Sequence, residues 1–212
     1  RGGGHLAAPG FIVAYLTRIT FPLISQYVLE RRVIDVSLNN LEFHTDGHRF
    51  TGTALVSPRF APLPDNPAAG HSDADIVRDN AALYARLKEQ LFDANFDVVM
   101  PPLQAASSTG SWGKRKGVLE RSGRLLRTGF LLAVLTLAGD TEIIEQQAVA
   151  FFVDPSPPMY GEVKMESIEH QGKTGYFARR AGCCLFWRIR VEDVYCSGCI
   201  LLSQEEQTIR FK

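Results

Sequence analysis

All four cysteines of this chain lie between positions 183 and 199, close to its C-terminal end. They are Cys183, Cys184, Cys196 and Cys199. Thiolates gathered on so short a segment can supply every ligand of an all-cysteine metal site, and zinc and the iron of iron–sulfur clusters accept such a set. The segment is therefore limited to a metal centre, a pair of disulfides or a thiol redox switch.

Composition argues against disulfides as a folding requirement. The chain has 212 residues, of which 45% are hydrophobic, and a chain of this size can bury a core without covalent cross-links. The charged and apolar regions typical of a secretory signal do not appear at the start of the sequence. We therefore expect reduced thiols and a cytoplasmic protein.

The charge balance and the apolar runs exclude two further classes. There are 23 basic and 23 acidic residues, whereas nucleic-acid binding proteins usually carry a basic surplus, so no nucleic acid is expected as a partner. Residues 11–29 are interrupted by polar side chains, and residues 130–138 are too few to cross a bilayer, so no transmembrane helix is expected. Arg121, Arg124 and Arg127 indicate a solvent-facing helix, with contact to a siderophore or peripheral contact to the inner membrane surface as the alternatives.

Periodicity and turn residues predict the order of elements in the N-terminal half. Asp46 and Gly47 form the Asp-Gly pair that is typical of a hairpin turn. We expect a helix at 9–30, a hairpin of strands at 36–43 and 48–56, an irregular loop at 57–70, and a helix from Ser72, as its N-cap, to about residue 95.

The C-terminal half predicts two further helical regions and a second hairpin. The helices are expected at about 111–137 and 141–152, and the hairpin strands at 162–169 and 174–181, joined by the turn 170–173. The fold class is therefore α+β, a single domain of several helices packed with antiparallel hairpins, followed by a short cysteine-rich segment. We place residues 1–182 in the α+β part and 183–212 in the metal-binding segment of the same unit.

The cysteine spacing leaves the identity of the metal open. Cys196-Ser197-Gly198-Cys199 is a Cys-x-x-Cys turn that directs two sulfurs at one metal. The adjacent Cys183 and Cys184 are unusual for zinc, because adjacent side chains diverge on an extended backbone. They suit the larger [2Fe-2S] centre better, although both metals accept four thiolates.

The four cysteines lie within the motifs 177–188 (FARRAGCCLFWR) and 195–199 (YCSGC). With weaker support from residues 35–41 (DVSLNNL) and 111–113 (SWG) and from the apolar N-terminal helix, these motifs resemble the C-terminal region of FhuF-like ferric-siderophore reductases. The gap between the cysteine pair and the Cys-x-x-Cys is one residue longer than is usual in that family. The resemblance implies a [2Fe-2S] cluster on all four cysteines.

The resemblance also implies an activity, a substrate and an electron donor. The expected reaction is one-electron reduction of Fe(III) in a ferric siderophore, with electrons from an external ferredoxin or reductase. A basic surface edged by aromatic side chains would hold an anionic siderophore, and the expected contacts are Arg179, Arg180, Trp187 and Arg188. The alternative function is a siderophore- or protein-binding module with a structural four-cysteine zinc site.

Overall fold

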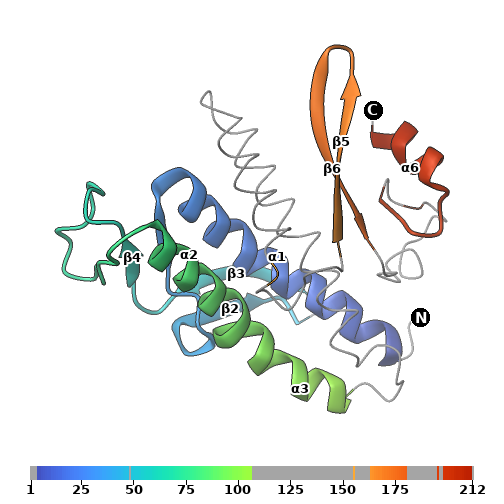
Figure 1. Ribbon diagram of the computed structural model, residues 1–212. Coiled ribbons are helices and arrows are strands. Elements are labelled where there is room, and N and C mark those ends of the chain that lie inside the picture. The colour runs from blue at the N-terminus through green and yellow to red at the C-terminus, as the bar shows by residue number, and fades with distance from the viewer. Residues whose placement is uncertain are drawn as a thin grey trace.

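The computed structural model describes residues 4–47, 49–106, 155, 163–180, 195 and 198–211. In this part of the chain the fold is α+β, with helices and three antiparallel strand pairs (Figure 1). The predicted fold class is confirmed. The helices predicted at 111–137 and 141–152 lie outside the described residues.

The N-terminal helix α1 (Gly4–Glu30) confirms the predicted helix and begins before it. Apolar side chains three or four positions apart form its buried face, and they include Ile12, Leu16, Ile19 and Leu23. Pro22 falls on the exposed side of this helix. These apolar side chains place one face of α1 in the core.

The hairpin β2 (Leu41–Thr45) and β3 (Phe50–Leu55) confirms the first predicted hairpin. Gly47 adopts a φ of 88°, which only glycine tolerates well. The Asp46 carboxylate accepts a hydrogen bond from the Arg49 backbone N–H at 2.9 Å, which closes the turn. The turn predicted from the Asp-Gly pair is therefore confirmed.

The predicted strand at 36–43 and the predicted loop at 57–70 are each wrong in part. Residues 36–40 are not a strand, because the Asn40 side chain bonds the backbone of Asp35 and Ser57 and favours the tight turn η1 (Leu38–Asn40). The predicted loop instead contributes β4 (Phe60–Pro62), which pairs with β1 (Arg32–Ile34). Proline has no backbone N–H to donate to a neighbouring strand, and the end of a strand, where Pro62 lies, is one of the places that tolerate it.

The second helix starts later than predicted. Its N-cap is Asp79, whose carboxylate accepts a hydrogen bond from the Ala82 N–H at 2.8 Å, and α2 spans Asn80–Lys88. Ser72 is therefore not the cap. The segment after Ser72 is bound to β4 instead, where the Asp75 N–H donates to the Phe60 carbonyl at 2.9 Å.

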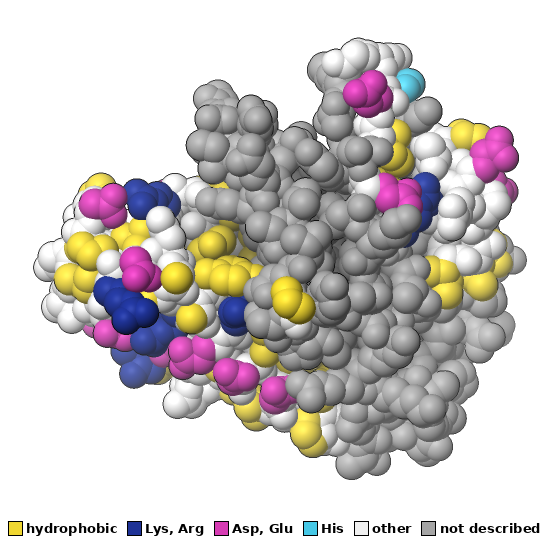
Figure 2. All heavy atoms as spheres, viewed as in Figure 1, with side chains coloured by type: hydrophobic (Ala, Val, Ile, Leu, Met, Phe, Trp, Pro, Cys, Tyr) yellow, Lys and Arg dark blue, Asp and Glu magenta, His cyan; other side chains and the backbone are white. Residues whose placement is uncertain are grey.

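The helical run also extends beyond its predicted end at residue 95. It continues through a π-helical segment, η2 (Glu89–Phe96), into α3 (Asp97–Ala106). Figure 1 shows α1 and this run lying side by side, and the apolar core contains residues of both. Within the view of Figure 2, acidic and basic side chains are interspersed over this part of the molecule.

The π-helical segment places two buried amides against the backbone of Val36. The Val36 N–H donates to Gln90 Oε1 at 2.8 Å, and the Val36 carbonyl accepts from Asn95 Nδ2 at 2.9 Å. Asn95 Nδ2 also donates to the Gln90 carbonyl at 2.7 Å, and the Tyr15 hydroxyl donates to Asn95 Oδ1. The backbone N–H and carbonyl of the buried Val36 are thus satisfied by side chains of η2 and not by a neighbouring strand.

The second predicted hairpin is confirmed as β5 (Val163–His170) and β6 (Lys173–Arg180). Gln171 and Gly172 both have positive φ, 51° and 74°, as a two-residue type I′ turn requires. The helix α6 (Gln204–Phe211) follows the cysteine segment and was not predicted. Arg179 of β6 bonds directly to α6, so the predicted boundary at 182/183 falls inside one hydrogen-bonded unit.

In the part of the chain that the structure describes, no helix combines the length and the apolar content that crossing a bilayer requires.

Candidate metal centre

Cys199 is the one predicted ligand among the described residues. It is a free cysteine, and its side chain lies in the interior, with 2% of the residue exposed. Cys183, Cys184 and Cys196 lie outside the described residues, so the predicted four-cysteine set stays a prediction. Among the described residues, no group of three or more His, Cys, Asp and Glu side chains is arranged to hold a metal ion.

The backbone carbonyl of Cys199 is held by two hydrogen bonds. The Leu202 N–H donates to it at 3.1 Å, which closes a tight turn, and Gln207 Nε2 of α6 donates to it at 3.1 Å. The same Gln207 nitrogen donates to the Leu202 carbonyl at 3.1 Å. A single buried amide therefore fixes the turn that follows Cys199.

Helix α6 begins where it does because Ser203 and Glu206 form a capping box. Ser203 Oγ accepts from the Glu206 N–H at 3.1 Å, and the Glu206 carboxylate accepts from the Ser203 N–H at 2.8 Å. These hydrogen bonds from Ser203, the backbone one foremost, lower the pKa of the Glu206 carboxyl below its ordinary value. The N-cap of the helix is thereby fixed at Ser203, four residues after Cys199.

The other end of the Cys-x-x-Cys segment is bound to the same helix. Arg210 Nη1 donates to the carbonyl of Tyr195, the residue before Cys196, at 2.7 Å. Gln207 and Arg210 are three positions apart and therefore lie on one face of α6. One face of a short helix thus holds the backbone on both sides of residues 196–199.

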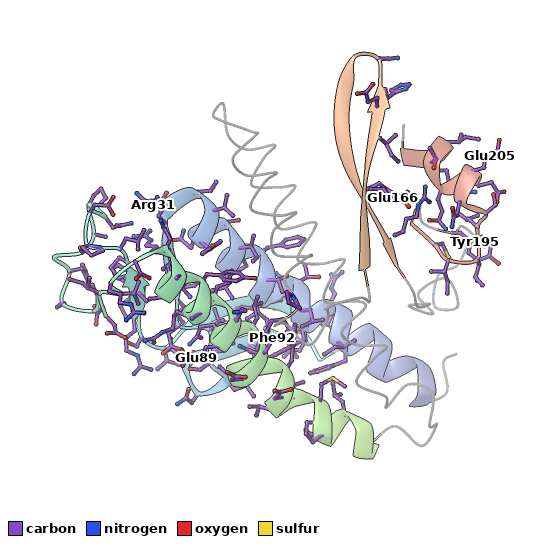
Figure 3. The ribbon with its side chains drawn as sticks, in the orientation of Figure 1. Arg31, Glu89, Phe92, Glu166, Tyr195 and Glu205 are labelled. Carbon is purple, nitrogen blue, oxygen red and sulfur yellow. The ribbon has the colours of Figure 1, made fainter. Side chains whose placement is uncertain are left out.

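Arg179 joins the β5–β6 hairpin to this helix. Its guanidinium donates to the Glu166 carboxylate, to the Gln204 carbonyl at 3.3 Å, to Gln207 Oε1 at 3.1 Å and to Thr208 Oγ1 at 2.8 Å. Its side chain is only 14% exposed. In Figure 3, Glu166 lies on the hairpin on the side that faces α6.

The four residues predicted to contact substrate are placed only in part. Arg179 has the internal role just described, and its predicted contact with a siderophore stays a prediction. Arg180 ends β6 opposite Val163. The side chain of Arg180, together with Trp187 and Arg188, lies outside the described residues.

The described residues fit a metal centre at this place in the chain. The Cys199 thiol is a soft donor of the kind that zinc and iron–sulfur centres take. Cys199 is buried. The carbonyls of Cys199 and Tyr195 are held by hydrogen bonds from α6, and these bonds leave the Cys199 sulfur available to a metal. Backbone that is already held at Tyr195 and Cys199 reduces the ordering cost of binding a metal there.

A pocket of about 160 Å³ lies elsewhere, beside β1 and β4. Arg59 and Arg86 stand on its rim, but each is paired with a carboxylate, Asp35 and Asp75 respectively, at 2.8 Å. Ligand pockets usually hold about 300 Å³ or more. This pocket is therefore too small and too nearly neutral for a bulky anionic siderophore.

The first region of weaker resemblance, residues 35–41, has a structural role. The Asp35 carboxylate accepts from the Ser37 N–H at 3.0 Å, and Asn40 is buried against the backbone of Ser57. These contacts account for the polar residues of this segment without a ligand. Residues 111–113 lie outside the described residues.

No protein-family model matches the chain, and neither a curated protein nor a solved structure shows a significant similarity to it.

Gln207 and Arg210 were not foreseen from the sequence. The pattern Ser-x-x-Glu at 203–206 is the capping-box signal and could have located α6 directly after the cysteines. Once the helix is placed, residues three apart are known to share a face. Their contact with the two ends of the Cys-x-x-Cys follows only from the tertiary structure.

Proposed function

We propose that the protein is a one-electron reductase of ferric siderophores with a [2Fe-2S] centre on Cys183, Cys184, Cys196 and Cys199. The observation that supports the proposal is the buried Cys199 in a loop whose two ends are held by α6. The resemblance of the cysteine pattern to FhuF-like reductases supports the choice of iron over zinc.

The chemistry of the substrate explains why such a centre is useful. Fe(III) is a hard ion held by siderophore oxygens, and Fe(II) is bound by them much less tightly, so reduction releases the iron. A [2Fe-2S] centre, when bound, supplies a one-electron relay that matches this step. The role of the chain is to hold the four thiolates and to exclude water around Cys199.

The electron donor and the location are parts of the same proposal. The only dinucleotide-like pattern, at residues 2–7, does not follow a predicted strand, so an external ferredoxin or reductase is the proposed donor. We propose a cytoplasmic protein, with peripheral contact to the inner membrane through the Arg121, Arg124 and Arg127 stripe as an additional element.

The alternative is a binding module with structural zinc on the same cysteines. Four thiolates suit tetrahedral zinc, and a closed four-sulfur site would be redox-inactive. The anchored Cys-x-x-Cys supports either metal equally. Only the metal itself separates the two functions.

The deciding experiment is an anaerobic absorbance spectrum of the full chain before and after dithionite, with iron, zinc and acid-labile sulfide quantified in the same sample. A [2Fe-2S] reductase is expected to be brown, to contain equal iron and sulfide, and to bleach on reduction. A colourless protein with one zinc ion per chain would overturn the reductase proposal and establish the zinc module.

Reversing the charge at Arg180 is expected to weaken binding of an anionic ferric siderophore about tenfold at low ionic strength, because a cation near the ligand becomes an anion. The visible spectrum should stay unchanged. The measurement is a binding titration of Arg180→Glu against Arg49→Glu, which makes the same charge change on an exposed turn. Equal affinity of the two variants would remove Arg180 from the substrate surface.

A further inference from the structure

We propose that α6 is a clamp that sets the geometry of the Cys-x-x-Cys loop, with Gln207 as the positioning residue for Cys199 and Arg179 as the residue that holds Gln207. The clamp is defined by Gln207 and Arg210 on one face of α6 and by the Cys199 and Tyr195 carbonyls that they bind. Its effect on a bound metal rests on the proposed function; its effect on the loop does not.

The Gln207 amide is fixed in one orientation by its partners. Its oxygen accepts from the Arg179 guanidinium, and its nitrogen donates to the Cys199 and Leu202 carbonyls, each at 3.1 Å. The opposite orientation would place the amide oxygen against two carbonyl oxygens and the amide nitrogen against a cation. Because the residue is 93% buried, with 7% of it exposed, water cannot replace these partners.

Arg179 is fixed in turn by groups of both the hairpin and the helix. The Glu166 carboxylate pairs with it from β5, and the ring of Phe177 lies 5.1 Å from the guanidinium carbon. Phe177 is itself buried. The chain of contacts therefore runs from a charge on β5 through Arg179 and Gln207 to the carbonyl of a predicted metal ligand.

Holding the Cys199 carbonyl also orients the N–H on the other side of that peptide. In a trans peptide the carbonyl and the following N–H point in opposite directions, so Gln207 directs the Ile200 N–H away from α6. Backbone N–H groups beside ligand sulfurs are among the groups that tune the potential of an iron–sulfur centre. The position of this N–H is thus set by the Gln207 side chain through the carbonyl of Cys199.

The test compares Gln207→Met with Gln204→Met in the full chain. Methionine keeps the length of glutamine but cannot donate to the carbonyls, and its sulfur is only a weak acceptor for Arg179. Gln204 lies one turn earlier on α6 with an exposed side chain, and only its backbone carbonyl bonds Arg179. Far-UV circular dichroism of both variants verifies that the overall secondary structure is retained.

The first measurement is the alkylation rate of Cys199 in the metal-free protein, followed by peptide mass spectrometry. Gln207→Met is expected to react about tenfold faster than the wild type, because loss of the clamp makes the loop open more often. Gln204→Met should react at the wild-type rate. Equal rates for Gln207→Met and the wild type would overturn the clamp, whatever metal the protein holds.

The second measurement uses the iron-loaded protein and separates positioning from simple stability. Gln207→Met should keep its iron and sulfide content but show a shifted reduction potential and an altered visible circular dichroism spectrum. An unchanged potential and spectrum at full occupancy would overturn the positioning role. A wild type without iron would refute the proposed function, and the alkylation rates would then decide the clamp alone.

A second variant covers the case in which Gln207→Met fails to fold. Arg179→Lys keeps the positive charge but removes the planar guanidinium. An ammonium group cannot donate to Gln207, Thr208 and Glu166 in the same geometry. It is expected to increase the alkylation rate of Cys199 in the same direction as Gln207→Met. A wild-type rate in Arg179→Lys would show that Arg179 does not hold the clamp.

Discussion

Replacing Cys199 by serine is expected to abolish stable iron binding by the full chain. Serine offers a hard hydroxyl in place of a soft thiolate, and the buried side chain cannot be replaced by a neighbour because the loop is held on both sides. Mutation of a residue that hydrogen-bonds to a metal ligand lowers metal affinity about 10- to 100-fold, so loss of the ligand itself should lower it at least about 100-fold. The measurement is iron and sulfide per chain after reconstitution.

The control for this substitution is Leu201→Ser. Leu201 lies two residues further on in the same turn and is half exposed, so the change introduces a serine without removing a sulfur. This variant should retain its iron and its absorbance. If Cys199→Ser kept full iron occupancy and the wild-type reductase rate, Cys199 would not be a ligand and the four-cysteine assignment would be wrong.

Replacing Asn95 by alanine is expected to lower the free energy of unfolding by about 3 kcal/mol. The change leaves the buried carbonyls of Val36 and Gln90 without the Asn95 donor, and it removes the acceptor of the Tyr15 hydroxyl. Burial raises the pKa of Tyr15 well above its ordinary value, so this hydroxyl stays protonated and cannot become an acceptor-only group. Denaturant unfolding followed by circular dichroism measures the loss.

Asp93→Ala is the matched control for this second substitution. Asp93 lies in the same π-helical segment, but its side chain is exposed, and surface changes of this kind usually stay within about 0.5 kcal/mol. A similar small loss in Asn95→Ala would show that the amide network contributes little. A loss confined to Asn95→Ala would establish that the π-helical segment is held by this network.

The correct parts of the sequence-based prediction were those encoded by neighbouring residues. The helix α1 follows from an apolar stripe, and the β5–β6 hairpin follows from alternation around a turn at Gln171 and Gly172. Each of these signals lies within a few residues of the structure that it produces. Local periodicity was therefore sufficient for both.

The errors arose where a distant partner decided between local alternatives. Ser and Asp are both good N-cap residue types, and the hydrogen bonds of Asp73 and Asp75 to Phe60 exclude a helix that starts at Ser72. Residues 36–40 have an adequate strand pattern, but Asn40 bonds the backbone at Ser57 and turns the chain. A sequence pattern does not contain the position of such a partner.

In the candidate metal centre, too, some features follow from neighbouring residues and others from distant partners. The sequence by itself determined the soft donor set, because four thiols within one short segment restrict the chemistry to metals and thiol redox reactions. Only the tertiary structure decided how the Cys-x-x-Cys is supported, since Gln207, Arg210 and Arg179 become its supports through contacts between α6, the loop and the hairpin. Ligand identity is a property of side-chain chemistry, whereas ligand geometry depends on hydrogen bonds between segments that are distant in sequence.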